Sequence, residues 1–166
     1  MKVVVVDDHP LARKGIISIL SEGAGCTEIK EAGNIEDAQK IIGSENIDIA
    51  IIDLRLGEED GLDIVAYGRE ISPGTKYIIL TSFMSKEDFL KAETMSVEGY
   101  LLKEALVEDI VFVVDQVSRG KRYYDPGVIT YYRQKGKSED AINSLTGREK
   151  EVLGELGKGL SNEEIA

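Results

Sequence analysis

The sequence predicts an α/β protein: a five-stranded, doubly wound parallel sheet, followed by the start of a small all-α domain. The first observation is that short β-branched runs alternate with longer stretches of helical spacing through residues 1–120. The second is that three of these runs are nearly continuous Val, Ile and Leu, which is typical of strands buried on both faces. The third is an ordinary globular composition, with 42% apolar and 31% charged residues in a chain of 166.

Five strands are expected, each a short run bounded by polar or turn-forming residues. They are Lys2–Val6, Thr27–Glu31, Asp48–Ile52, Lys76–Leu80 and Gly99–Leu102. Because each run is followed by a stretch long enough for a helix, the strands are expected to be parallel and joined by right-handed crossovers.

Five helices are expected, each identified by apolar residues that recur at helical spacing. Their marker positions are Leu11, Ile16, Ile19 and Leu20; Ile35, Ala38, Ile41 and Ile42; Leu62, Val65 and Ala66; Phe89, Leu90 and Ala92; and Leu106, Ile110, Val113, Val114 and Val117. A sheet of this class binds its ligands beyond the carboxyl ends of its strands, so functional residues are sought there.

The end of the chain departs from this alternation. Pro126 and Gly127 are turn-forming residues within a segment that predicts a linker. The expected division is residues 1–120 as the first domain, 121–143 as the linker and 144–166 as the beginning of a helical domain.

Composition and charge exclude several classes of function. The longest unbroken apolar runs are far shorter than the ~18 residues of a membrane span, so no membrane partner is expected. The single cysteine, Cys26, excludes an internal disulfide and fits a reducing compartment, so a cytoplasmic location is expected. Residues 1–120 carry the whole net charge of −11 and would repel phosphate backbones, whereas residues 121–166 are neutral. This asymmetry indicates two modules.

Polar side chains stand at the carboxyl ends of four expected strands. Asp7 and Asp8 follow the first strand, and Asp53 follows the third. Thr81 follows the fourth strand and Lys103 the fifth. In a parallel sheet these ends converge on one edge. Three carboxylates repel one another unless a cation joins them, and their hard oxygen atoms suit Mg²⁺.

The same edge is suited to phosphoryl chemistry. A hydroxyl and an ammonium beside the metal would bind phosphoryl oxygens. The chain has no glycine-rich phosphate loop, which argues against a nucleotide ligand. Taken singly, Asp53 is explained equally well as a helix cap. Lys103, taken singly, is most simply explained as a solvated surface lysine. Their joint occurrence at corresponding strand ends favours a carboxylate that accepts a phosphoryl group as an acyl phosphate.

Seven short stretches match a known family in order and spacing. They are Val-Val-Asp-Asp-His-Pro at 5–10, Ile-Ile-Asp-Leu at 51–54, Asp-Gly-Leu at 60–62, Leu-Thr-Ser at 80–82, Gly-Tyr-Leu-Leu-Lys at 99–103, Leu-Thr-Gly-Arg-Glu-Lys-Glu-Val-Leu at 145–153 and Lys-Gly-Leu-Ser-Asn-Glu-Glu-Ile-Ala at 158–166. The first five resemble the receiver domain of bacterial two-component response regulators, which has a flavodoxin-like fold. The last two resemble the start of a LuxR-type helix-turn-helix. Together they resemble the NarL/FixJ class of transcriptional regulators.

This resemblance implies a phosphoacceptor and a metal site. Asp53 is implied to receive a phosphoryl group from a sensor histidine kinase. The implied cofactor is Mg²⁺, held directly by Asp8 and Asp53 and, through water, by Asp7. The backbone carbonyl of Arg55 is a further implied ligand.

The resemblance also implies a switch and an assembly. Thr81 and Lys103 are implied to bind the phosphoryl oxygens, and Tyr100 matches an aromatic residue that changes rotamer on activation. A phosphoryl group would pull Thr81 inward, and Tyr100 can fill the space vacated. A phosphorylation-dependent homodimer is expected through the fourth helix, fifth strand and fifth helix, with the first and fifth helices as the alternative face.

The expected function is therefore a response regulator whose phosphorylation at Asp53 switches a DNA-binding output that regulates transcription. No enzymatic activity is expected beyond hydrolysis of its own acyl phosphate. A receiver-only signalling adaptor is an alternative, although the helix-turn-helix resemblance speaks against it. An aspartyl-phosphate phosphohydrolase is another, but its nucleophile would follow the first strand rather than the third.

The helix-turn-helix resemblance is incomplete. Residues 161–166 match only the beginning of the first helix of the pair, so the recognition helix that would read base edges is absent from these 166 residues. The chain is therefore expected to be a C-terminally truncated form that does not recognise a specific DNA sequence. Promoter DNA is expected as a partner of the full-length form only.

Overall fold

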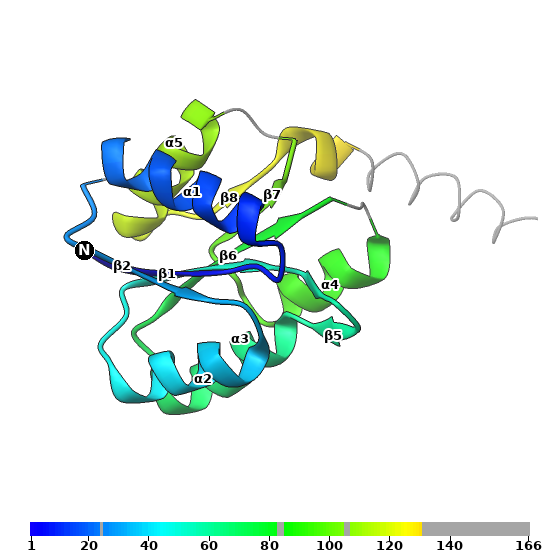
Figure 1. Cartoon of the computed structure of the whole chain (residues 1–166). Helices are drawn as coiled ribbons and strands as arrows, with labels where there is room; N and C mark the ends of the chain where they lie inside the picture. The colour runs from blue at the N-terminus through cyan, green and yellow to red at the C-terminus, as the bar shows by residue number, and fades with distance from the viewer. Residues whose placement is uncertain (24, 83–84, 105–106, 131–166) are drawn as a thin grey trace, which may run out of the picture. The chain divides into compact units, whose positions relative to one another are not determined.

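The structure is a computed structural model that describes residues 1–23, 25–82, 85–104 and 107–130. Figure 1 shows the elements, which in chain order are β1 (Lys2–Val6), α1 (Pro10–Gly23), β2 (Glu28–Ala32), α2 (Ile35–Ser44), β3 (Ile49–Asp53), β4 (Arg55–Leu56), β5 (Glu59–Asp60), α3 (Leu62–Ile71), β6 (Lys76–Thr81), α4 (Lys86–Thr94), β7 (Gly99–Leu102), α5 (Val107–Ser118) and β8 (Tyr123–Tyr124). The expectations for residues 144–166, including the helix-turn-helix, lie outside the described residues.

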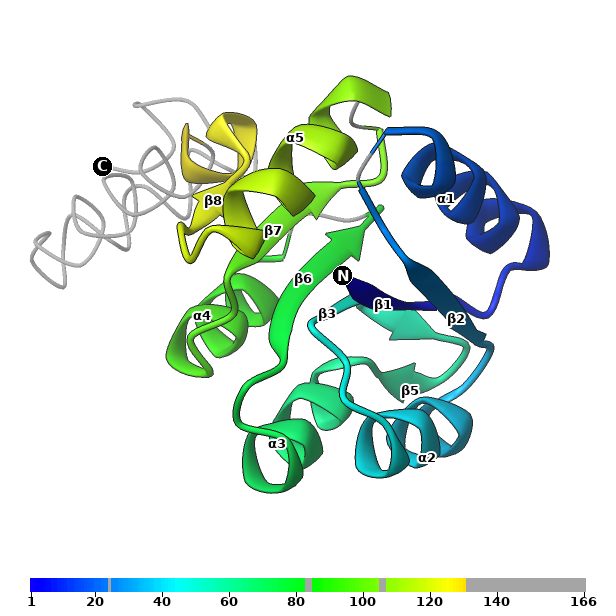
Figure 2. The ribbon, with the colours of Figure 1, turned by 90° about the vertical axis from the view of Figure 1, so that its left-hand side faces the viewer.

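The expected parallel sheet is present, with helices on both of its faces. Within the part of the chain that the structure describes, six strands pair in the order β2-β1-β3-β6-β7-β8, and each pairing is parallel. Helices α1 and α5 cover one face, and α2, α3 and α4 cover the other (Figures 1 and 2). The doubly wound α/β class is therefore confirmed. Within the described ranges, no helix is both long and apolar enough to cross a membrane.

The core is mostly aliphatic, in a chain that has no Trp and three Phe, although Tyr77 and Tyr100 are also fully buried. Strands β1 and β3 are buried along almost their whole length. The side chains that pack between the sheet and the pair α1 and α5 are Val3, Val5, Ile16, Leu20, Ile49, Ile51, Ile78, Leu80, Leu101, Ile110, Val113, Val114 and Val117. Burying one such side chain contributes about 1.5–3 kcal/mol, so this packing holds the central strands in register and fixes where their carboxyl ends lie.

Local signals at the helix starts determine how the helices meet the sheet. Asn34 caps α2 and Ser85 caps α4, each accepting a hydrogen bond from a backbone N–H of the first turn. Helix α3 instead begins after Gly61, where an added Cβ would collide with the backbone carbonyl oxygen of Asp53. Glycine at this position lets α3 start directly against the end of β3.

A short antiparallel hairpin follows β3 and was not expected from the sequence. Strand β4 pairs with β5, so that Arg55 stands opposite Asp60. Gly57 lies in the turn with φ of +64°, a left-handed conformation that glycine adopts without a steric penalty. Two-residue strands made largely of charged residues have no alternating apolar pattern, which is why periodicity did not predict them.

The sixth strand corrects the expected boundary between the first domain and the linker. Strand β8 runs parallel to β7, with Tyr123 opposite Gly99 and Tyr124 opposite Tyr100. The compact unit extends from Met1 to Val128, and Val128 is fully buried. The expected linker therefore begins too early at residue 121. Gly120, with φ of +81°, lies in the turn that returns the chain from α5 to the sheet edge, whereas Pro126 and Gly127 come after β8.

Candidate functional site

The sheet gathers the polar side chains that were selected from the sequence. Asp7 and Asp8 directly follow β1, and Asp53 is the last residue of β3. Thr81 is the last residue of β6, and Lys103 directly follows β7. These four strands are consecutive neighbours in the sheet and run in the same direction, so their carboxyl ends lie along one edge.

Lys103 joins two of the carboxylates. Its Nζ atom donates a hydrogen bond of 2.7 Å to Asp7 Oδ2 and one of 2.6 Å to Asp53 Oδ2. Asp7 is 1% exposed and Asp53 is 5% exposed. The ammonium is therefore the charge that compensates two carboxylates taken almost entirely out of water.

The same contacts perturb the protonation of the pair. Burial raises the pKa of the Asp53 carboxyl above its ordinary value, although the hydrogen bond and charge of Lys103 oppose that shift. Burial alone would lower the pKa of the Lys103 ammonium, but its hydrogen bonds to Asp53 and Asp7 outweigh this and raise it. Lys103 therefore stays protonated at neutral pH and supplies a fixed positive charge to the site.

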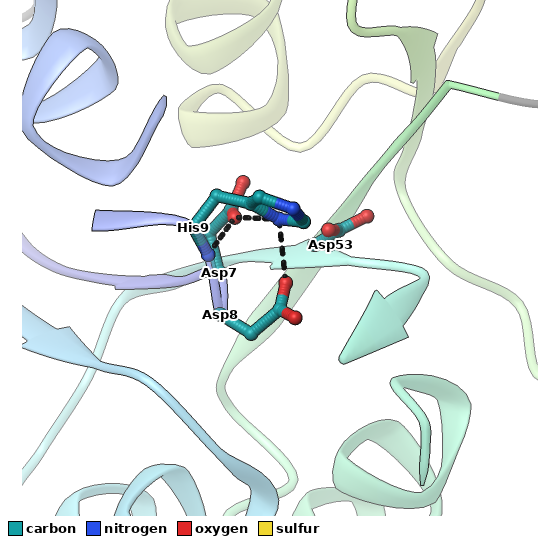
Figure 3. Close-up of side chains that lie close together, drawn as sticks. All are labelled: Asp7, Asp8, His9 and Asp53. Carbon is teal, nitrogen blue, oxygen red and sulfur yellow. Dashed lines mark hydrogen bonds and ion pairs between the residues drawn. The ribbon is translucent and has the colours of Figure 1, made fainter. Parts of the chain in front are cut away.

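Asp8 and His9 complete an acidic cluster that could hold a metal ion. One ligand atom from each of Asp7, Asp8, His9 and Asp53 lies within 4.8 Å of the others, and Figure 3 shows the four side chains close together. Asp8 Oδ1 is 2.8 Å from His9 Nδ1, yet it is buried and accepts no well-formed hydrogen bond within the described part of the chain. A buried carboxylate oxygen without a donor fits a cation ligand.

The turn after β1 orients this cluster. Asp7 Oδ1 accepts a hydrogen bond of 2.8 Å from the backbone N–H of His9, and the Asp7 carbonyl accepts one of 2.6 Å from Arg13 Nη1. Sequence reasoning interpreted His9 as a turn or surface residue and assigned no role to Arg13. The signal that could have found His9 is its position directly after the acidic pair, whereas Arg13 reaches Asp7 only because α1 folds back on the strand end.

Arg55 connects the site to helix α4. Its backbone N–H donates to Asp53 Oδ1 at 3.3 Å, and its guanidinium lies 2.5 Å from a carboxylate oxygen of Asp88. Asp88, in the first turn of α4, is 5% exposed. Sequence reasoning missed it, because an acidic residue in the first turn of a helix is ordinarily explained by the helix dipole.

Thr81 and Tyr100 are both buried. The Thr81 carbonyl accepts a hydrogen bond of 2.8 Å from the backbone N–H of Lys103, so the ends of β6 and β7 hold these two residues side by side. The Tyr100 ring meets the ring of Phe89 edge to face, with centroids 5.4 Å apart. Tyr100 therefore faces inward against α4 rather than toward solvent.

Comparison with known proteins identifies the family. The family model described as the response regulator receiver domain matches residues 3–115. The chain is 33% identical over 168 residues to the nitrate/nitrite response regulator protein NarP of Escherichia coli. The aligned region covers 99% of this chain and 78% of NarP. It is 32% identical over 167 residues to the response regulator protein VraR of Staphylococcus aureus, covering 100% of this chain and 80% of VraR. A solved DNA-binding response regulator of the LuxR family from Staphylococcus aureus shares 26% identity at a TM-score of 0.66, covering 70% of this chain and 98% of that chain.

The chain thus belongs to the response regulator receiver domain family. It is a response regulator homologous to the NarL/LuxR-type transcriptional regulators of two-component systems, which confirms the resemblance inferred from the motifs. Receiver domains accept a phosphoryl group and bind Mg²⁺ in an acidic pocket, and the cluster of Asp7, Asp8, His9 and Asp53 in this chain is a group that could hold a metal ion.

Proposed function

We propose that Asp53 is the phosphoacceptor of this response regulator, and that its phosphorylation by a sensor histidine kinase switches a DNA-binding output that regulates transcription. The observation that carries this proposal is the Lys103 ammonium, which bridges Asp53 and Asp7 through hydrogen bonds of 2.6 and 2.7 Å. A cation fixed beside a nucleophilic carboxylate offsets the repulsion between that carboxylate and an anionic phosphoryl donor.

The proposed reaction is a direct phosphoryl transfer. A carboxylate oxygen of Asp53 attacks phosphorus, so that a P–O bond forms while the P–N bond to the kinase histidine breaks. Lys103 and the Thr81 hydroxyl bind the oxygens of the phosphoryl group. Burial of Asp53 supports this role, because restricted access of water slows hydrolysis of the acyl phosphate.

Mg²⁺ is the proposed cofactor, and it would neutralise charge on the phosphoryl oxygens. Asp8 fits a direct ligand because its buried Oδ1 accepts no well-formed hydrogen bond among the described residues. Asp53 is the second direct ligand, and the Arg55 carbonyl is a third. Both oxygens of Asp7 already accept hydrogen bonds, from His9 and Lys103, which supports a role for Asp7 through water.

The proposed switch uses Thr81 and Tyr100. A phosphoryl group on Asp53 would attract the Thr81 hydroxyl toward the site, and the buried Tyr100 ring would move into the space vacated. The upstream partner is a sensor histidine kinase, and the downstream partner is promoter DNA, contacted by a complete helix-turn-helix. Phosphorylation would favour a homodimer.

Acetyl phosphate with Mg²⁺ tests the phosphoacceptor. We expect intact mass spectrometry to find one phosphoryl group per chain, dependent on Mg²⁺, and peptide mapping to place it on Asp53. Asp53→Asn should remove it. Asp48→Asn is the matched control, because Asp48 immediately precedes β3, at the end of the strand away from Asp53, where it accepts a hydrogen bond from the Lys2 backbone N–H. Phosphorylation at another residue, or in Asp53→Asn, would contradict the proposal.

The metal ligands have a separate test. Asp8→Ala should weaken Mg²⁺ binding measured by calorimetry, because fewer anionic oxygens remain to replace water around the ion. Asp63→Ala, at the first turn of α3, should leave binding unchanged and serves as the control. Equal affinity of the Asp8 variant and the wild type would show that the metal assignment is wrong.

A further inference from the structure

Strand β8 covers the outer edge of β7. The backbone N–H of Tyr123 donates to the Glu98 carbonyl at 2.8 Å, and that of Asp125 donates to the Tyr100 carbonyl at 2.9 Å. The Tyr124 hydroxyl donates to the Val97 carbonyl at 2.9 Å. Figure 2 shows β8 alongside β7, where the sheet would otherwise end. The segment after α5 is therefore held in the compact unit by specific bonds.

Three aromatic rings connect this strand to the interior. Phe89 of α4 meets Tyr100 edge to face at a centroid distance of 5.4 Å, and it meets Tyr124 edge to face at 5.8 Å. Phe89 is thus the shared neighbour of a ring on β7 and a ring on β8. Edge-to-face pairs contribute favourably beyond the burial of their area, so the position of one ring affects the packing of the next.

We propose that the edge of β7, together with Phe89, is a docking surface for the chain's own segment 121–128, and that docking depends on the side chain of Tyr100. The dependence on phosphorylation rests on the proposed function, in which Tyr100 moves when Asp53 is phosphorylated. The docked segment directly precedes residues 129–166 in the sequence.

The contacts explain why this strand, rather than another, would respond. β8 is two residues long, and among the described residues it pairs with β7 alone. Short edge elements open at a lower free energy than central strands, so the loss of a single ring contact is enough to shift their equilibrium. Tyr100 is also opposite Tyr124 in the strand register, so its withdrawal removes support from Tyr124 both directly and through Phe89, and segment 121–128 opens more often.

The docked segment also bears on assembly. The surface first considered for a homodimer spans α4, β7 and α5, and β8 occupies the open edge of its strand. A second copy can pair with that edge only after segment 121–128 leaves it. While the segment is docked, the face formed by α1 and α5 remains the compatible alternative.

Hydrogen exchange followed by mass spectrometry tests the coupling without phosphorylation. Tyr100→Leu should speed exchange in segment 121–128 about three- to tenfold relative to a reference peptide from β3, the range expected for loss of one aromatic pair. In a Phe89→Leu background, the same Tyr100 substitution should have a clearly smaller effect, because only the direct cross-strand contact with Tyr124 then remains. No acceleration by Tyr100→Leu, or equal acceleration in both backgrounds, would overturn the proposal.

Two further variants serve as controls. Phe112 of α5 meets Tyr123 edge to face at 5.7 Å, on a ring pair separate from Phe89. Phe112→Leu should therefore speed exchange in β8 while leaving the effect of Tyr100→Leu intact. Tyr124→Leu removes the ring at the other end of the series. If Phe89→Leu fails to fold, the Tyr124→Leu background replaces it, and Tyr100→Leu should speed exchange less in that background than in the wild type. Loss of the Tyr100 effect in Phe112→Leu would overturn the proposal.

Treatment with acetyl phosphate and Mg²⁺ separates this inference from the proposed function. A phosphoryl group on Asp53 with about threefold or faster exchange in segment 121–128 supports both. A phosphoryl group on Asp53 with unchanged exchange overturns the docking inference alone. If no phosphoryl group forms on Asp53, the proposed function fails, and the substitutions above still decide whether docking depends on Tyr100.

Discussion

Replacing Lys103 by methionine removes the ammonium from the acidic site while keeping a side chain of similar length. Its Nζ atom is 2.7 Å from Asp7 and 2.6 Å from Asp53, and both carboxylates are almost completely buried. Removing one partner of a buried ion pair costs about 3–5 kcal/mol, because the remaining charge stays out of water. The Lys103 side chain is 19% exposed, so water reaches the ion pair. We therefore expect the free energy of unfolding without Mg²⁺ to fall by about 2–3 kcal/mol.

Urea unfolding followed by circular dichroism measures this loss at neutral pH. The midpoint should fall with little change in slope, because the same surface is exposed on unfolding. Mg²⁺ should stabilise Lys103→Met more than the wild type, since the ion no longer competes with the ammonium for the carboxylates. Lys40→Met is the control, because Lys40 forms an exposed ion pair with Glu36 and its loss should change nothing measurable. A Lys103 variant as stable as the wild type would refute the electrostatic reasoning.

Three further predictions concern helix packing, a helix cap and the Arg55–Asp88 ion pair, each measured by urea unfolding. Gly68→Ala should destabilise by about 1–3 kcal/mol, because the added Cβ would collide with the Tyr77 hydroxyl; a neutral result would contradict the close approach of α3 to β6. Asn34→Ala should lose about 1 kcal/mol with the cap of α2, while replacement by aspartate, which keeps the acceptor, should restore most of it. Arg55→Ala should lose about 1–3 kcal/mol by leaving the buried Asp88 carboxylate without its ion pair. Adding Asp88→Asn should recover part of that loss, and an additive double variant would count against the pair.

The local pattern of apolar residues in the sequence predicted part of the fold. The runs of Val and Ile predicted β1 and β3 within one residue of their observed bounds, because a strand buried on both faces must be apolar at consecutive positions. The direction shared by parallel strands then placed Asp7, Asp8 and Asp53 at the same edge. Residues as distant as Asp7 and Lys103 could be assigned to one site before any distance was known, because the strand ends carry them there.

The tertiary structure decided which groups touch. The hydrophobic pattern of the sequence could not predict that Lys103 Nζ bridges Asp7 and Asp53, or that Arg55 pairs with the buried Asp88. These contacts depend on side-chain length and on how closely separate elements approach one another. Strand β8 is the clearest case: two tyrosines in a turn-rich segment have no strand pattern of their own. They pair with β7 because folding leaves an open sheet edge and an aromatic neighbour beside them, and that environment exists only once the sheet and α4 have assembled.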